Sequence, residues 1–164
     1  ESTYFEIIRK KTATLLASCA AAGAKSAGAS DEQVEKMRQF GENIGIAFQI
    51  KDDLFDYQQI NATGKPSGND IQEKKMTLPL IYALNNASAL ERKRIKKAIN
   101  RSNRNKGNIR EIVSFVTDNG GLAYALQKMN EYKNKSLEIL QEFEDNEGRR
   151  SLTDLVNYTI ERNK

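Results

Sequence analysis

The chain has 164 residues, of which 38% are hydrophobic and 29% are charged, and 26 Lys and Arg against 22 Asp and Glu give a net charge of +4 at pH 7. A chain of this length is the size of one domain and can bury a core without a metal or a disulfide. With no His and the single Cys19, the sequence excludes Ser-His-Asp and Cys-His catalysis, a zinc centre of His and Cys, and an intrachain disulfide. Any metal bound here is therefore held by oxygen ligands.

No segment has the pattern of a secretory signal or of a membrane span. The opening residues, ESTYFEIIRKK, lack a basic region followed by an apolar one. The longest uncharged run covers fifteen residues, 76–90, whereas a membrane-spanning helix needs about 18 apolar residues. We therefore expect a soluble, cytoplasmic protein without a transmembrane segment.

Apolar residues recur at intervals of three and four, which predicts helices. A first helix is expected over about residues 4–24. Its buried stripe is expected to consist of Ile8, Leu15, Cys19 and Ala22. Ser30 and Gln33 then form a capping box, and the pattern after them predicts one long helix that ends near Tyr57.

Turn-forming residues gather in 58–73 and predict a loop after the long helix. A helix follows over 78–86, with Pro79 tolerated in its first turn. Ser88 and Glu91 form a second capping box and predict the start of another helix.

The sequence Asn119-Gly120-Gly121 separates a short helix from a long one, and a final helix follows Gly148. The inner side of the long helix is expected to carry Leu122, Leu126, Met129, Leu137, Leu140 and Phe143. The final helix is expected to be built on Leu152, Leu155, Val156 and Ile160. No alternating strand pattern and no internal repeat occurs, so we predict an all-α protein.

The excess of positive charge is local. Residues 91–110 contain nine Lys or Arg and one acid, Glu91, so this segment carries +8 and the rest of the chain −4. It contains no Phe, Tyr or Trp, whereas a nucleic-acid surface combines basic with aromatic residues. We predict a solvated helix face with Ile95, Ala98 and Ile99 packed beneath it, and no nucleic-acid partner.

Acidic residues gather on the last turns of the long helix. At about 100° per residue, Gly45, Gln49, Asp52 and Asp56 share a narrow face, and Asp53 adds a third carboxylate. Like charges at this spacing disfavour a helix unless something compensates them. Mg²⁺ prefers carboxylate oxygens and often shares its coordination with a phosphate. An acidic helix end that faces solvent is the alternative.

Lysines accompany these acids and point to an anionic ligand. Lys65 and Lys75 lie on the glycine-containing stretch after the helix, so that a metal and ammonium groups together would clamp a diphosphate. Lys11 and Thr12 flank the buried stripe of the first helix, from which both can reach an anion. For Lys11, a side chain that extends from the helix edge into solvent is the alternative.

Four segments in chain order resemble motifs of the all-trans polyprenyl diphosphate synthases, the prenyltransferase family of isoprenoid biosynthesis. They are the KT segment 11–13, the second aspartate-rich motif 48–56, the GK..G.DI loop 64–71 and the K.TLPL stretch 75–80. The closing residues 152–162 are similar to the tail of the long-chain, octaprenyl-type members, so the resemblance covers essentially the whole chain. Lys74 stands where many members have Gly.

The resemblance implies an antiparallel helical bundle of the isoprenoid synthase type around a deep cavity. It implies condensation of isopentenyl diphosphate with an allylic diphosphate, with Mg²⁺ as the cofactor and a homodimer as the complete enzyme. The metal would be held by Asp52, with Asp53 and Asp56 on bound waters or neighbouring cations. The diphosphate would be bound by Lys11, Lys65 and Lys75. Thr12 and Gln49 would face the allylic cation and, with Lys11, be the catalytic residues.

One departure from the family concerns the first aspartate-rich motif, because this chain has a single DDxxD segment, at 52–56. We therefore expect residues 1–164 to be the C-terminal portion of a synthase domain, incomplete at its N-terminus and inactive alone. The alternative is a non-catalytic helical subunit that completes or regulates a separate synthase. A third hypothesis is an anion-binding helical protein that uses residues 91–110.

Overall fold

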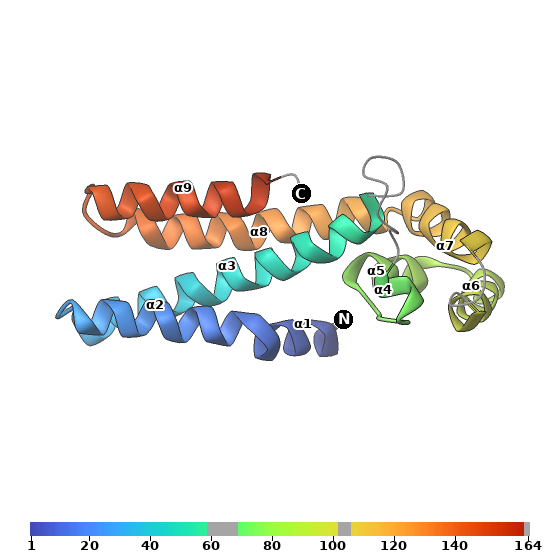
Figure 1. The fold of residues 1–164 in the computed structure, drawn as a ribbon, viewed down its shortest axis with the longest axis horizontal. Helices are drawn as coiled ribbons and strands as arrows, with labels where there is room; N and C mark the ends of the chain where they lie inside the picture. Colours follow the sequence, from blue (N-terminus) through green and yellow to red (C-terminus); the bar gives the residue numbers. More distant parts are fainter. Residues whose placement is uncertain (59–68, 102–105, 163–164) are drawn as a thin grey trace. The chain divides into compact units, whose positions relative to one another are not determined.

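The computed structural model describes residues 1–58, 69–101 and 106–162, apart from the side chains of Gln58, Arg101 and Lys106. All regular secondary structure in this part of the chain is helical, and it contains no strand (Figure 1). The all-α prediction is confirmed. The chain divides into two compact units, one of Glu1 with residues 52–127 and one of residues 2–51 with 128–164.

The unit of residues 2–51 and 128–164 is a bundle of antiparallel helices. Its elements are α1 (Ser2–Ile8), the π-helical turn η1 (Arg9–Ala13), α2 (Thr14–Ser26), most of α3 (Asp31–Gln58), most of α8 (Gly121–Gln141) and α9 (Glu147–Glu161). Figure 1 shows α8 and α9 side by side, and α2 alongside the first part of α3. Phe40, Leu140 and Val156 form the centre of a core to which α3, α8 and α9 contribute.

The unit of residues 52–127 contains the short helices. They are α4 (Asn69–Gln72), α5 (Leu78–Asn86), α6 (Ala89–Arg101) and α7 (Lys106–Asp118). Its core joins Tyr57 from α3, Ile71 from α4, Leu80 from α5, Ile95 from α6 and Ile112 from α7. Within the described residues of both units, no helix has the length and apolar character that a bilayer crossing requires.

Both predicted capping boxes are present. The Ser30 N–H donates to Gln33 Oε1 over 3.0 Å, and the Gln33 N–H donates to Ser30 Oγ over 3.3 Å. At the start of α6 the Ser88 N–H donates to Glu91 Oε2 over 3.2 Å, and the Glu91 N–H donates to Ser88 Oγ over 3.3 Å. The predicted helix over 78–86 is also confirmed, with Pro79 in its first turn.

The buried stripe of the first helix differs from the prediction because of the π-helical turn. The buried side chains there are Tyr4, Ile8, Ala13 and Ala17. The step of five residues from Ile8 to Ala13 is the i to i+5 spacing of a π turn, and it rotates all later residues relative to an α-helical register. The other three residues of the predicted stripe are exposed: Leu15, Cys19 and Ala22.

Three further expectations are wrong in part. On α8, Ala125 and Met129 form the buried line, so that Leu126, one residue further around, is 47% exposed. Phe143 lies beyond the end of α8, and Leu155 of α9 is 56% exposed. The last helix begins at Glu147 rather than after Gly148, because the Asn146 side chain accepts a hydrogen bond from the Arg149 N–H over 2.9 Å.

Two glycines of α3 let its backbone approach the first helix closely. A Cβ on Gly41 would lie 2.5 Å from the Leu16 carbonyl oxygen, and a Cβ on Gly45 would lie 2.6 Å from the Ala13 Cα. No side chain fits at either position without displacing backbone. The packing of η1 and α2 on α3 therefore depends on both glycines.

Candidate active site

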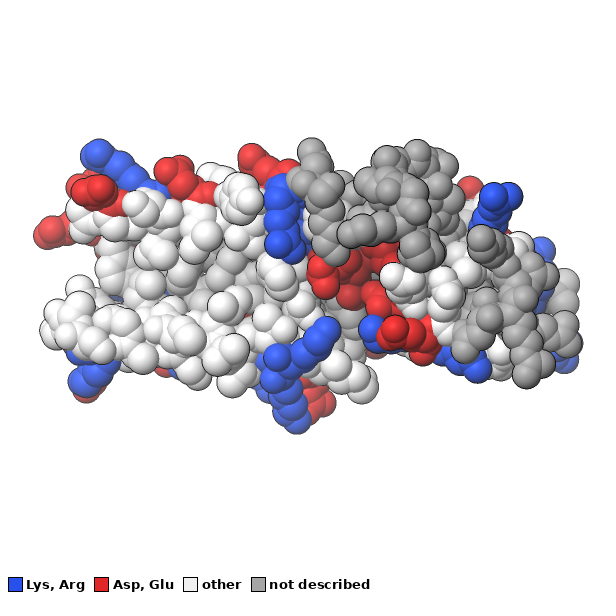
Figure 2. All heavy atoms as spheres, in the orientation of Figure 1, with Lys and Arg blue, Asp and Glu red and all other residues white. Residues whose placement is uncertain are grey.

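Three carboxylates lie on the last two turns of α3. Asp52, Asp53 and Asp56 are each half-buried. The Asp56 carboxylate accepts two backbone hydrogen bonds from the first turn of α4, from the Asn69 N–H over 2.9 Å and from the Asp70 N–H over 3.0 Å. Acidic side chains gather near the end of α3 and beside α4 in the space-filling view (Figure 2).

The contact through Asp56 explains why α4 forms inside a segment that was predicted as loop. Four residues are too few to make a stable helix from local propensity alone. Asp56 satisfies two of the N–H groups that an isolated first turn leaves without partners. The loop prediction is therefore wrong for 69–72. The residue that stabilises this helix, Asp56, lies thirteen positions before Asn69 in the chain.

Lys75 lies directly after α4 and is held by acids of the same segment. Its ammonium group is 2.9 Å from Asp70 Oδ1 and 2.8 Å from a Glu73 carboxylate oxygen. The hydrogen bond to Glu73, followed in size of effect by the one to Asp70, raises the pKa of Lys75 above its usual range. Asp56, Asp70 and Lys75 are thereby connected, through the backbone of α4, into one polar cluster.

A buried hydrogen bond ties the end of α3 to the start of α5. The Tyr57 hydroxyl and Thr77 Oγ1 are 2.6 Å apart, and both side chains are almost fully buried. Burial raises the pKa of the Tyr57 phenol above its ordinary value, so it stays protonated as a hydrogen-bonding group. This pair was not predicted from the sequence, although Thr77 belongs to the K.TLPL stretch 75–80.

The predicted metal ligands have the chemistry for Mg²⁺ but do not form a closed cage. In the described part of the chain no group of three or more Asp, Glu, Cys or His side chains is arranged to hold a metal ion. Mg²⁺ needs no such cage, because it typically takes one or two carboxylates and completes its shell with water and phosphate oxygens. Asp52 and Asp53 fit that role, with Asp56 engaged on α4.

The remaining predicted site residues belong to the other compact unit, except Lys65, which lies outside the described residues. Lys11 and Thr12 are in the π-helical turn, Lys11 exposed and Thr12 half-buried. Gln49 is only 5% exposed on α3. A π turn inside an α-helix often marks a functional site.

Thr12 stands at one side of an apolar groove in the same unit. The groove has a volume of about 450 Å³ and is lined by η1, α2, α3 and α9, with Leu16, Phe40, Ile44 and Phe48 among its walls. Its lining is apolar apart from Thr12 and Thr159. Leu155, exposed on α9, also faces this groove.

Two cations near the groove were not predicted as site residues. The Arg162 guanidinium lies 4.6 Å from the centre of the Phe48 ring. Partial burial and, to a lesser degree, the positive charge of Arg162 lower the pKa of Lys51. Lys51 and Arg162 lie within the segments 48–56 and 152–162, which resemble family motifs. Their positions in these segments are the only feature of the sequence that could have identified them as candidate site residues.

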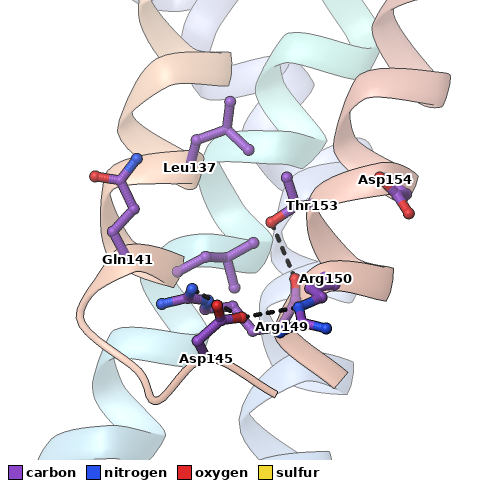
Figure 3. A pocket seen from close by; sticks show the side chains of 8 residues that line it. Leu137, Gln141, Asp145, Arg149, Arg150, Thr153 and Asp154 are labelled. Carbon is purple, nitrogen blue, oxygen red and sulfur yellow. Dashed lines mark hydrogen bonds and ion pairs between the residues drawn. The ribbon is translucent and has the colours of Figure 1, made fainter. Parts of the chain in front are cut away.

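A second hollow, between the end of α8 and the start of α9, is not a candidate active site (Figure 3). Three of its charged groups already bind one another: Asp145 lies 3.0 Å from both Arg149 Nη2 and Arg150 Nε. The hydrogen bond from Arg150 is the main cause of the lowered pKa of Asp145. These ion pairs stabilise the α8 to α9 connection, and none of the predicted site residues lines the hollow.

The chain matches the family model of the polyprenyl synthetases over residues 1–116. It is 30% identical to the octaprenyl diphosphate synthase of Haemophilus influenzae over 164 residues, 99% of this chain and 50% of that protein. Among solved structures it resembles the geranylgeranyl pyrophosphate synthase of Bacteroides thetaiotaomicron, with a TM-score of 0.88 and 41% identity over 99% of this chain and 54% of the other.

A polyprenyl synthase from Caulobacter crescentus, solved with calcium and isoprenyl diphosphate, gives a TM-score of 0.87 and 34% identity over 99% of this chain and 50% of that one. The chain thus spans about half the length of the relatives that it matches. Their all-α fold agrees with the helices described above, and their names include long-chain synthases. The family match over 116 of 164 residues establishes that this chain belongs to the polyprenyl synthetase family.

Proposed function

We propose that this chain carries the half of a prenyltransferase that holds the second aspartate-rich motif. The complete enzyme condenses isopentenyl diphosphate with an allylic diphosphate and requires Mg²⁺. The observation that carries this proposal is the group of carboxylates at the end of α3, fixed to α4 by Asp56, in a chain of the polyprenyl synthetase family.

In this proposal Asp52 and Asp53 provide oxygen ligands to Mg²⁺, and Asp56 holds α4 and metal-bound waters. When bound, Mg²⁺ neutralises the negative charge that grows on the diphosphate as its carbon–oxygen bond breaks. The helix positions the two ligating carboxylates before substrate arrives. Fixed groups of this kind favour the transition state because they need no reorganisation during the reaction.

The lysines complete the charge balance on the leaving diphosphate. Lys75 is paired with Asp70 and Glu73, and we propose that it exchanges these carboxylates for diphosphate oxygens when substrate binds. Lys11 is exposed on the π turn, where its ammonium group is available to an anion. Lys65 has the same proposed role on the basis of its motif.

Thr12 and Gln49 are proposed to face the allylic cation through their oxygen atoms. Thr12 borders the apolar groove, whose aliphatic and aromatic walls suit a prenyl chain and, once a chain fills the groove, would keep water from a reactive carbocation. The nearly complete burial of Gln49 restricts the positions that its amide can take.

We further propose that the chain is inactive alone, because it contains one DDxxD segment where the family resemblance implies two. The complete enzyme is proposed to be a cytoplasmic homodimer. The alternative, a non-catalytic subunit that completes or regulates a separate synthase, predicts that the carboxylates of α3 are dispensable for turnover.

Incorporation of labelled isopentenyl diphosphate tests both ideas. The chain alone should show no turnover, and addition of the half that carries the first motif should restore Mg²⁺-dependent condensation. In the restored enzyme, Asp52→Ala should lower kcat by about 100-fold or more, the range seen when one group that stabilises transition-state charge is lost. Lys93→Ala is the control, because Lys93 is exposed on α6 and is not among the predicted catalytic, diphosphate-binding or metal-binding residues.

Clear turnover by the chain alone would contradict the incomplete-site proposal. Equal losses in Asp52→Ala and Lys93→Ala would contradict the assignment of Asp52, and an unchanged rate in Asp52→Ala would favour the non-catalytic subunit.

A further inference from the structure

Helix α6 has two chemically distinct sides, and the predicted solvated face is confirmed. Ile95 is fully buried, and Ala98 and Ile99 are nearly so. The opposite side carries exposed Arg and Lys side chains, and Leu90, in the first turn, is 80% exposed. Lys and Arg side chains are visible on the part of the surface that α6 and α7 form (Figure 2).

Part of this charge is used to hold the protein together. Arg94 Nε lies 3.1 Å from a carboxylate oxygen of Glu111 on α7. Arg92 donates hydrogen bonds to the carbonyl of Asn85, in the last turn of α5, and to the carbonyl of Ala87, just beyond its end. These two arginines have internal structural roles.

The three lysines of the same face do not. Lys93, Lys96 and Lys97 are exposed, and none forms an ion pair with another described residue. They line a shallow hollow on α6 together with Arg92. Three like charges at spacings of one to four residues repel one another, so an external anionic surface would stabilise them.

The position of Leu90 indicates which kind of anionic surface fits. Leu90 lines a hollow of α6 with Lys93, Arg94, Lys97 and the acid Glu91, so that this exposed apolar side chain lies among three cations and one carboxylate. An anionic bilayer offers both phosphates for the lysines and an acyl boundary for the leucine. A nucleic acid offers the phosphates, but residues 91–110 contain no aromatic side chain to stack on a base.

We propose that α6 docks on an anionic phospholipid bilayer, with Lys93, Lys96 and Lys97 on headgroup phosphates and Leu90 at the acyl boundary. The surface lies outside the proposed catalytic residues, and the binding needs no diphosphate substrate. Failure of the proposed enzymatic function would leave this inference untouched, and the reverse also holds.

Co-sedimentation with vesicles tests the proposal on the intact chain. Binding is expected to vesicles of phosphatidylcholine mixed with phosphatidylglycerol, to weaken as salt is added, and to be absent from phosphatidylcholine alone. Each lysine near an anionic surface favours partitioning by roughly five-fold. The variant Lys93→Gln/Lys96→Gln/Lys97→Gln should therefore bind on the order of 100-fold more weakly.

The matched control removes the same charge elsewhere. Arg9→Gln/Lys25→Gln/Lys135→Gln neutralises three exposed cations of the other compact unit and should retain nearly all vesicle binding. Leu90→Ser keeps every charge and should bind vesicles several-fold more weakly, because it loses the apolar contact. Circular dichroism of each variant verifies that its helices are intact.

Equal losses in the two triple variants would overturn the proposal, because net charge rather than α6 would then determine binding. Binding to a DNA duplex at least as tight as binding to mixed vesicles, together with no effect of Leu90→Ser, would also overturn it and indicate a nucleic-acid surface.

Discussion

A single backbone conformation distinguishes Lys74 from the residues around it. Its φ is 58°, a left-handed value that costs about 1–2 kcal/mol for a residue with a Cβ. The Lys75 N–H donates to the Asp70 carbonyl and the Lys74 N–H to the Ile71 carbonyl, which is the Schellman arrangement that usually places Gly here. Lys74→Gly should raise the free energy of unfolding by about 0.5–1 kcal/mol, as measured by urea denaturation.

Gly28 provides the inverse control at the same scale. It has a φ of 79° with nothing within 4 Å of an added Cβ, so that Gly28→Ala should lose a similar amount through backbone strain alone. A Lys74→Gly variant that is less stable than the parent would mean that the Lys74 side chain contributes more than its strain costs.

At the scale of the element, the two capping boxes differ in one titratable group. The hydrogen bond from the Ser88 hydroxyl, followed in size of effect by the one from the Ser88 N–H, lowers the pKa of Glu91 below its ordinary value of 4.5. A lowered pKa in the folded protein means that this carboxylate stabilises α6 above about pH 4.5, and that the contribution is lost as the pH falls through the folded pKa. The other box has Gln33, which does not titrate.

Ser88→Ala and Ser30→Ala should each lower the free energy of unfolding by about 1 kcal/mol near pH 7. As the pH falls below 4.5, the loss in Ser88→Ala should shrink, while the loss in Ser30→Ala should stay constant. Denaturant titrations of both variants at several pH values measure this. A pH-independent loss at both positions would show that Glu91 contributes no charge-assisted bond.

At the scale of the whole molecule, tertiary contacts rather than helix propensity decide whether replacing a helix glycine by alanine raises or lowers the free energy of unfolding. Gly41 packs against the Leu16 carbonyl, so Gly41→Ala should destabilise the chain by about 1–3 kcal/mol through overpacking. Gly23 lies in α2 with nothing within 4 Å of an added Cβ, so Gly23→Ala should stabilise it by about 0.5–1 kcal/mol. Thermal unfolding separates the two, and a stabilised Gly41→Ala would contradict the close approach.

The sequence by itself determined those features that depend on neighbours within a few residues. The capping hydroxyls of Ser30 and Ser88, Pro79 in a first turn and the Asn119-Gly120 break marked helix ends because their hydrogen bonds and backbone angles are local. The order of the motifs along the sequence likewise indicated the family. The same holds for the solvated face of α6.

Only the tertiary structure decided what depends on residues that meet across the chain. The π turn at 9–13 shifted the buried stripe to Ala13 and Ala17, which follow the surface of α3 rather than an α-helical period. Asp56 stabilises α4, which begins thirteen residues later, and Tyr57 forms a hydrogen bond with Thr77, twenty residues later in the chain. Such bonds carry no local signature, because each partner alone is an ordinary polar residue until folding removes both from water.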